Sequence, residues 1–196
     1  MNKNIILAGV GGQGILTIAA IIDLAAMGEG LKVKQAEVHG MSQRGGAVQS
    51  HLRISDSEIF SDLIPLGKAD LILSVEPMES LRYLPYLSSG GTIVTAIQPF
   101  DNIANYPNLD NILNTIKNSG RSILIDAVAL AGEAGNLKSS NMVLLGAASP
   151  YLGIEKEKIE KSIEQLFSRK GQETIDINLR AFKLGLKASE NKPVNI

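Results

Sequence analysis

The sequence predicts an α/β protein, a three-layer α/β/α sandwich around a mixed, mostly parallel, Rossmann-like sheet. Short β-branched apolar runs alternate along the chain with segments of helical periodicity, the pattern of helices packed on both faces of a sheet. The glycine-rich stretch GVGGQG stands where the first strand meets the first helix. The short connection between two alternating runs, residues 38–47, suits antiparallel neighbours, and for this reason we expect a mixed sheet.

The first helix is expected to be almost wholly apolar. A buried strand at 4–9 leads through the glycine-rich stretch into a helix at about 13–27, which two nearby glycines would end. Only Thr17 and Asp23 interrupt its apolar residues, so it must be covered on all sides. One side can pack on the sheet, and we expect the other to await a second chain.

Period-two and period-3.6 patterns predict the remaining elements. Strands are expected at 31–39, 47–55, 69–77, 92–99 and 121–129, with a short hairpin strand at 58–60. Helices are expected from 77 to about 84–91, at 108–120, and across 141–149, 154–167 and 175–186. Residues 1–188 should form a single domain, and 189–196 a loose tail.

The composition excludes several classes of function. With 19 basic and 20 acidic residues the chain has no basic field for nucleic acid. It lacks cysteine, so it can form no disulfide, hold no iron–sulfur cluster through thiolates and offer no thiol nucleophile. With two histidines, a metal site on this chain is not expected. No run is long enough for a membrane span and no signal peptide is evident, so a cytoplasmic setting is expected.

The glycine-rich turn is a candidate anion-binding site. It satisfies G-x-G-x-x-G between a strand and a helix, where helix amides can hold a phosphate or carboxylate. Glu37 follows where a dinucleotide fold places its ribose-binding acid. Tight strand–helix packing is the alternative explanation, and a P-loop is excluded because Ile15 and Leu16 replace the required Lys and Ser/Thr. The candidate residues are Gly9, Gly11, Gly12, Gln13 and Gly14.

The loop EVHGMSQRGG, residues 37–46, is the second candidate site. Its polar side chains gather at the carboxyl end of a strand, where α/β folds bind ligands. The arginine can hold a carboxylate or phosphate through two hydrogen bonds, and the histidine titrates near neutral pH. Alternatively Arg44 pairs with Glu37, His39 caps the strand end, and His51 is a structural strand histidine. The candidates are His39, Ser42, Gln43, Arg44, Gly45 and Gly46.

Together, GVGGQGI and EVHGMSQRGGAVQSHLRI resemble the small subunit of indolepyruvate:ferredoxin oxidoreductase. That subunit is related to the gamma subunits, or domain III, of 2-oxoacid (pyruvate):ferredoxin oxidoreductases. NMVLLGA (141–147) and NLRAFKLG (178–185) resemble later landmarks of the same family, so the resemblance covers almost the whole chain. The string HGMSQRGG is its most specific element.

The resemblance implies a subunit that is inactive alone. In that family a large partner subunit binds thiamine diphosphate and magnesium and carries 4Fe–4S clusters. The assembled enzyme converts an arylpyruvate, coenzyme A and oxidised ferredoxin into an acyl-CoA, carbon dioxide and reduced ferredoxin. This chain has neither cysteine nor a GDG stretch for thiamine diphosphate. We therefore expect the 37–46 loop to serve the substrate and coenzyme A side of an active site centred in the partner.

Three alternatives remain open from the sequence. The chain is a gamma subunit for 2-oxoglutarate, pyruvate or branched-chain 2-oxoacids; or it is a free-standing dinucleotide-binding protein, which the glycine turn and Glu37 favour; or it is a structural assembly subunit without ligand contact.

Overall fold

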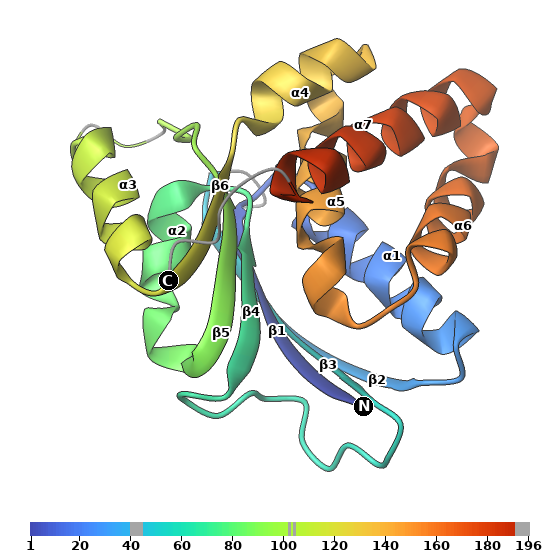
Figure 1. Ribbon diagram of the computed structural model, residues 1–196, viewed down its shortest axis with the longest axis horizontal. Coiled ribbons are helices and arrows are strands. Elements are labelled where there is room, and N and C mark those ends of the chain that lie inside the picture. Colours follow the sequence, from blue (N-terminus) through green and yellow to red (C-terminus); the bar gives the residue numbers. More distant parts are fainter. Residues whose placement is uncertain (40–44, 102, 104, 191–196) are drawn as a thin grey trace.

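The computed structural model describes residues 1–39, 45–101, 103 and 105–190, which build one α/β unit around a six-stranded sheet (Figure 1). Across the sheet the strand order is β2-β3-β1-β4-β5-β6. The strands are β1 (Asn2–Val10), β2 (Lys32–His39), β3 (Ala47–Ser55), β4 (Ala69–Ser74), β5 (Leu87–Ala96) and β6 (Arg121–Ile125).

The sheet is mixed because of a single strand, β3. It lies antiparallel between β1 and β2, whereas β1, β4, β5 and β6 run parallel to one another. The β1–β3 register runs from Asn2 opposite Ser55 to Val10 opposite Ala47. The short 38–47 connection thus joins antiparallel neighbours, and the predicted mixed, mostly parallel sheet is confirmed.

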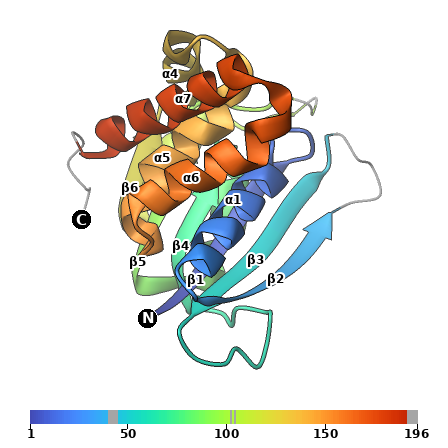
Figure 2. The ribbon, with the colours of Figure 1, turned by 90° about the vertical axis from the view of Figure 1, so that its right-hand side faces the viewer.

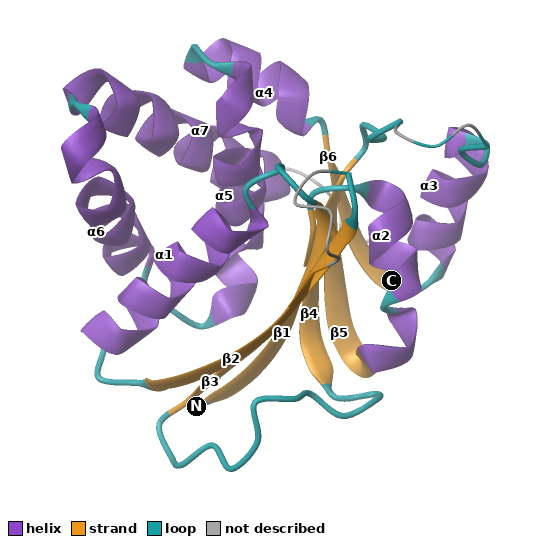
Figure 3. Cartoon of the chain, turned by 180° about the vertical axis from the view of Figure 1, so that it is seen from behind, coloured by secondary structure: helices purple, strands orange, loops and turns teal. Residues whose placement is uncertain are grey.

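Helices cover both faces of the sheet, which confirms the three-layer sandwich (Figures 2 and 3). One face carries α1 (Ile15–Gly28), α4 (Ala127–Ala134), α5 (Ser140–Leu152), α6 (Lys156–Phe167) and α7 (Gln172–Glu190). The other carries α2 (Pro77–Arg82) and α3 (Leu109–Asn118). Short 3₁₀ turns lie at η1 (Leu84–Tyr86), η2 (Leu137–Ser139) and η3 (Ser168–Lys170). Within the described ranges, no helix is both long and apolar enough to cross a bilayer.

The outer side of α1 is covered by this chain's own α6 (Figure 2). The backbone N–H of Glu155 donates to Glu29 Oε1 at 2.8 Å, and Lys158 Nζ donates to the carbonyl of Gly28 at 3.3 Å. The expectation that this side awaits a second chain is therefore wrong. Sequence periodicity shows that a helix needs cover, but not which later segment supplies it.

Three further elements differ from the prediction. Residues 56–68 form a loop, and the expected hairpin strand at 58–60 is absent. Residues 87–91, expected to end a helix, already belong to β5, which pairs with β4 through a register shift near Ala69. The strand predicted at 121–129 ends at Ile125, because Asp126 accepts from the N–H of Ala129 and starts α4.

Helices α5 and α7 pack backbone against backbone. A Cβ on Gly146 would lie 1.9 Å from the carbonyl oxygen of Phe182, and one on Gly185 would lie 1.8 Å from that of Val143. Real Cβ atoms never approach so closely, so only glycine permits this separation. The fully buried ring of Phe182 adjoins the contact.

Asp23 is the one acid in the apolar helix α1. Burial raises its pKa from 3.8 to about 6. Its Oδ1 is shielded from solvent and finds no hydrogen-bond donor within the described residues. The ionised side chain therefore destabilises the fold at neutral pH.

We expect Gly185→Ala to lower the free energy of unfolding by about 3 kcal/mol, because α5 and α7 must separate to admit the methyl group. Gly132→Ala in α4 is the matched control, since its Cβ would meet only Leu137 Cδ2 at 3.5 Å. The control should be neutral or stabilising by up to about 1 kcal/mol. Urea denaturation measures both, and equal effects would contradict the close contact.

Asp23→Asn should change the pH dependence of stability. Because the folded-state pKa lies above 3.8, the stability linked to protonation is present at low pH and lost as the pH rises through about 6. We expect the variant to be more stable than the wild type at pH 7 by about 1–2 kcal/mol, after discounting for partial exposure. The difference should shrink towards pH 4 in urea titrations. A pH-independent difference would show that Asp23 does not titrate in this range.

Candidate functional site

The candidate site lies where the strand connections change sides of the sheet. After β1 the chain continues into α1 on one face, and after β4 it continues into α2 on the other. The carboxyl ends of these adjacent parallel strands therefore diverge and leave a crevice, the usual ligand position in open α/β sheets. The turn after β1, which contains the predicted glycines, borders this crevice.

Three glycines of the turn, Gly9, Gly12 and Gly14, are required on steric or conformational grounds. A Cβ on Gly9 would lie 2.3 Å from Val75 Cγ2, so the strand end needs the space. Gly12 and Gly14 have φ values of +99° and +80°, which side chains rarely adopt. A Cβ on Gly14 would in addition lie 2.4 Å from Asn141 Nδ2. Gln13 closes the turn by accepting from the N–H of Val10 at 2.8 Å.

The two predicted motifs meet in space. The N–H of Gly11 donates to the carbonyl of Gly46 at 2.8 Å, and the N–H of Gly45 donates to the carbonyl of Gly11 at 3.4 Å. These bonds continue the β1–β3 ladder beyond its last pair, Val10 and Ala47. The end of the second motif is thereby fixed against the glycine turn.

The remaining residues of the second motif are placed only in part. His39 is the last residue of β2 and pairs with Val48, while its side chain is outside the described residues. Ser42, Gln43 and Arg44 also lie outside the described residues. Their proposed role stays a prediction.

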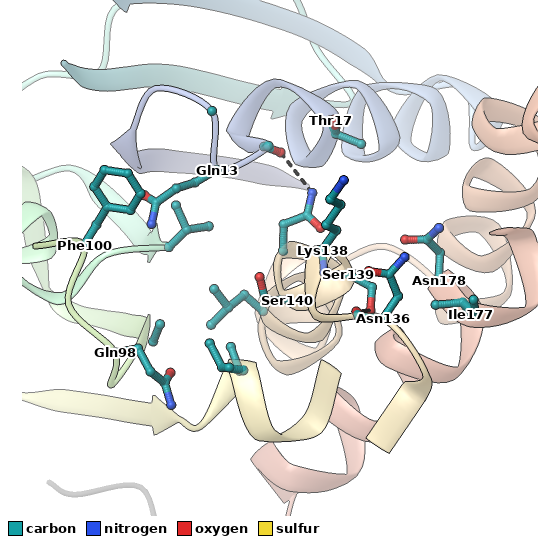
Figure 4. Close-up of a pocket in the computed structure, with 18 of the residues that line it drawn as sticks. Gln13, Thr17, Gln98, Phe100, Asn136, Lys138, Ser139, Ser140, Ile177 and Asn178 are labelled. Atoms are coloured by element: carbon teal, nitrogen blue, oxygen red, sulfur yellow. Dashed lines mark hydrogen bonds between the residues drawn. The ribbon is translucent and has the colours of Figure 1, made fainter. Parts of the chain in front are cut away.

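A pocket of about 630 Å³ opens beside the glycine turn. Figure 4 shows Gln98 and Phe100 on one side, and Asn136, Lys138 and Asn178 on the other. Its apolar lining comes from the sheet and helices, and its polar lining comes mostly from helix starts and the η2 turn. Further lining residues are Gly12, Gln13, Gly14, Thr17, Val75, Ala96, Pro99, Ala127, Val128, Ser139, Ser140, Asn141, Leu144, Phe167, Lys170, Thr174 and Ile177.

The electrostatics of the pocket favour an anion. Lys138 and Lys170 line it, and none of its described lining residues is Asp or Glu. Neither Gly14 nor Ser139, the residues before α1 and α5, makes a side-chain capping bond, whereas Asn141 within α5 accepts from the N–H of Met142. The positive ends of both helices border the pocket. Backbone amides at helix starts and lysine side chains commonly bind phosphates and carboxylates in proteins, and this pocket offers both.

Asn141 joins the two sides of this arrangement. Its Nδ2 donates to the carbonyl of Gly14 at 3.3 Å, and its Oδ1 accepts from the N–H of Met142 at 3.0 Å. The first turn of α5 is thus tied to the first turn of α1. This side chain therefore links the two helix starts beside the pocket.

A buried carboxylate holds the opposite wall. Glu76 is 1% exposed at the start of α2, where Oε2 accepts from the N–H of Glu79 at 2.8 Å. Its Oε1 accepts from the Tyr106 hydroxyl and from the N–H of Phe100. Burial, reinforced by this hydrogen bond, raises the pKa of Tyr106. The segment that carries Phe100 into the pocket is therefore tied to α2.

Comparison with known proteins agrees with this architecture. Residues 4–188 match the family model described as pyruvate ferredoxin/flavodoxin oxidoreductase. The chain belongs to this oxidoreductase family. It is 43% identical to indolepyruvate oxidoreductase subunit IorB of Thermococcus kodakarensis, over 95% of this chain and 96% of that one. It is 41% identical to the same subunit of Pyrococcus horikoshii, with the same coverage.

A more distant relative and a solved structure extend the comparison. The 2-oxoglutarate synthase subunit KorC of Archaeoglobus fulgidus is 26% identical over 98% of this chain and 92% of its own. The 2-oxoglutarate:ferredoxin oxidoreductase of Magnetococcus marinus, solved with 2-oxoglutarate, coenzyme A and succinyl-CoA, superposes with a TM-score of 0.80 at 22% identity. The superposition covers 98% of this chain but 32% of that longer one, so the fold described here forms one part of it.

Within this family fold, Glu37 does not occupy the place of a ribose-binding acid. It pairs with Ser50 of β3, and Ser50 pairs in turn with Leu7 of β1. A dinucleotide fold places the acid on the strand next to β1, whereas here the antiparallel β3 lies between them. The sequence spacing between the glycine turn and Glu37 matches the dinucleotide-binding fingerprint, but the order of the strands in the sheet does not.

His51 is a structural histidine, as its position in a strand predicted. It is 3% exposed, its Nδ1 accepts from the N–H of Ile64 at 3.0 Å, and its ring meets Tyr86 edge-on at 5.2 Å. Burial lowers its pKa, an effect that Asp62 opposes. The hydrogen bond requires a neutral Nδ1, consistent with that shift.

Sequence reasoning missed most of the pocket of this oxidoreductase subunit. Lys138, Lys170 and the 98–100 segment were not predicted, because no short motif marks them. Asn141 and Asn178 open the strings NMVLLGA and NLRAFKLG, which had been noted only as family landmarks. That signal identified the residues but not their place beside the glycine turn.

We expect Gly14→Ala and Asn141→Ala to be energetically coupled. In the wild type a methyl group at Gly14 displaces the Asn141 amide and breaks its hydrogen bond, whereas in the Asn141→Ala background only backbone strain remains. The coupling energy should be about 1 kcal/mol. Gly12→Ala is the control, since a Cβ there meets no atom within 4 Å. The loss of unfolding free energy caused by Gly12→Ala should be the same with and without Asn141. If the losses caused by Gly14→Ala and Asn141→Ala simply add, the proposed contact between these two residues is refuted.

Proposed function

We propose that this chain is the small subunit of a thiamine-diphosphate-dependent 2-oxoacid:ferredoxin oxidoreductase that acts on indolepyruvate and related arylpyruvates. The observation that carries the proposal is the pairing of Gly11 with Gly45 and Gly46 beside a pocket free of acidic lining residues among those described. This pairing brings together the two sequence motifs on which the resemblance to the indolepyruvate family rests. Two relatives named for indolepyruvate are 43% and 41% identical to this chain. The 2-oxoglutarate relative, at 26%, supports the alternative substrate less.

The chemistry is divided between two chains. In this proposal a large partner subunit holds thiamine diphosphate, magnesium and the 4Fe–4S clusters, as the family resemblance implies; this chain has no cysteine to ligate a cluster. Thiamine diphosphate supplies decarboxylation of the 2-oxoacid when bound there, and electrons pass to ferredoxin. The present chain binds and orients the co-substrate, coenzyme A, on the side facing that centre.

The pocket suits this task. Lys138 and Lys170 would neutralise phosphate groups, and the amides at the starts of α1 and α5 would donate hydrogen bonds to them. The apolar lining, including Leu144 and Phe167, would pack against the remainder of the ligand. Arg44, with Ser42, Gln43 and His39, would be this chain's contribution to the substrate and coenzyme A side of the active site.

Co-expression with the large subunit tests the proposal. We expect a stable complex that reduces a redox dye in a thiamine-dependent reaction, with arylpyruvates preferred over pyruvate, 2-oxoglutarate and branched-chain 2-oxoacids. A large subunit fully active without this chain would refute the proposed role, and a preference for 2-oxoglutarate would favour the related gamma-subunit function. Titration of the isolated chain with NAD(H), NADP(H) and FAD should give no tight binding, because Glu37 is separated from the glycine turn.

In that complex, Lys138→Ala and Lys170→Ala should each raise KM for coenzyme A about tenfold, the loss of roughly 1.4 kcal/mol of charge-assisted binding. Arg44→Ala should lower turnover or alter substrate and coenzyme A dependence. Lys161→Ala, an exposed lysine on α6, is the matched control and should leave the kinetics unchanged. Unchanged coenzyme A kinetics in both pocket variants would exclude this pocket as the binding site, and an Arg44→Ala complex with wild-type kinetics would exclude Arg44.

A further inference from the structure

Of the amide side chains that line the pocket, Asn178 on α7 is the most deeply buried, with 7% of its surface exposed. Its Nδ2 donates to the carbonyl of Thr174, one helical turn earlier, at 2.7 Å. Because a backbone carbonyl can only accept, this bond fixes which end of the amide is the nitrogen. The other end, Oδ1, remains as a hydrogen-bond acceptor.

The Asn178 oxygen faces the pocket. Figure 4 shows it on the side of Asn136 and Lys138, which line the same pocket. Among the described residues, the side chain of Asn178 forms the bond from Nδ2 and no other, so Oδ1 has no donor from this part of the chain. A nearly buried acceptor destabilises the site unless water or a ligand supplies a donor. This position therefore selects a ligand that brings an N–H or O–H group.

The surroundings of this oxygen are both cationic and apolar. Lys138 belongs to η2 and Lys170 to η3, and both turns contact α7. Lys170 Nζ lies 5.2 Å from the centre of the Phe167 ring. Ile177, next to Asn178 on α7, adds apolar surface to the pocket. A ligand group that fits here combines a hydrogen-bond donor, an apolar body and a neighbouring negative charge.

Hydrogen bonds fix this end of the pocket before any ligand arrives. The N–H of Lys138 donates to Asn136 Oδ1 at 3.0 Å, and Ser139 Oγ donates to the carbonyl of Asn136 at 2.7 Å. Arg180 Nε donates to the carbonyl of Ala134 at 3.1 Å, which ties α7 to the end of α4. A preformed site loses little conformational entropy on binding.

We propose that this end of the pocket binds an adenine nucleotide unit, with Asn178 Oδ1 accepting from the exocyclic amino group of the base. Ile177 packs against the ring, and Lys138 and Lys170 face the phosphate on its ribose. Adenine fits because it is flat, largely apolar and carries a donor at its edge, whereas a carboxylate or phosphate alone offers only acceptors. The inference rests on the proposed function, in which coenzyme A is the ligand, and assigns the nucleotide half of coenzyme A to α7. Asn178 is then the residue that distinguishes adenine from a base with an oxo group at the same position.

Calorimetric titration of the full chain with adenosine 3′,5′-bisphosphate tests the assignment. Inosine 3′,5′-bisphosphate, which has an oxo group in place of the amino group, should bind at least about tenfold more weakly, because two acceptors then face each other. Asn178→Ser should bind both compounds with similar affinity. Its hydroxyl can still donate to the Thr174 carbonyl, but the acceptor that faces the pocket is gone.

Ser189→Ala is the matched control. Ser189 is also buried on α7, at 6% exposure, and its Oγ donates to the carbonyl of Leu186 at 2.8 Å, away from the pocket-lining residues. This variant loses a comparable bond within the helix and should keep the preference for adenine.

Three binding results would overturn the proposal. The first is a wild-type chain that binds the two bisphosphates equally, or binds neither at about 1 mM. The second is a preference for adenine that survives Asn178→Ser. The third is binding of 4′-phosphopantetheine that weakens in Asn178→Ser while adenosine 3′,5′-bisphosphate does not bind, which would make a pantetheine amide the donor.

Kinetics of the complex with the large subunit separate this inference from the proposed function. Asn178→Ser should raise KM for coenzyme A about tenfold with kcat unchanged, and leave the ratio of kcat/KM for indolepyruvate and phenylpyruvate as it is. A changed ratio would show that Oδ1 accepts from the indole N–H of the substrate, and the adenine assignment would be wrong. An Asn178-dependent preference for adenine in a complex that does not use coenzyme A would support the site and refute the proposed function. An active complex whose chain lacks that preference would refute the site alone.

Discussion

The close contact between α5 and α7 determines the arrangement of the candidate site. Gly146 and Gly185 let the two helix backbones touch, and this separation sets where both helices lie over the sheet. The first turn of α5 carries Asn141 to Gly14, and α7 carries Asn178 into the pocket. A wider helix separation would therefore move two walls of the pocket relative to the glycine turn. The family landmarks NMVLLGA and NLRAFKLG therefore lie on the two sides of one helix–helix contact, that between α5 and α7.

The sequence was sufficient to predict the layers and the family. Alternation of strands and helices is a local property, and so is the glycine turn between β1 and α1. The short 38–47 connection predicted an antiparallel neighbour, because few residues cannot cross the sheet. The motif resemblance agrees with a family match over residues 4–188 and with identities above 40% to two relatives.

The errors concern features that depend on distant segments. Nothing near α1 indicates that α6, more than a hundred residues later, covers it. The spacing of Glu37 matched a dinucleotide fingerprint because spacing does not record that β3 enters the sheet beside β1. The hydrophobic residues at 58–60 suggested a strand, yet their environment is a loop anchored by Arg53 and His51. No sequence pattern near Lys138 or Lys170 predicts that the two side chains line the same pocket.

The bond between Asn141 and Gly14 spans 127 positions of the sequence, which has a consequence for folding. Contacts of such separation form late, after a large loss of chain entropy. During synthesis, the glycine turn and the apolar surface of α1 cannot complete their contacts until α5 and α6 have been translated. In that interval the nascent chain exposes the apolar surface of α1, and exposed apolar surface of this kind favours aggregation. The order of translation thus places the candidate site among the last parts of the chain to form.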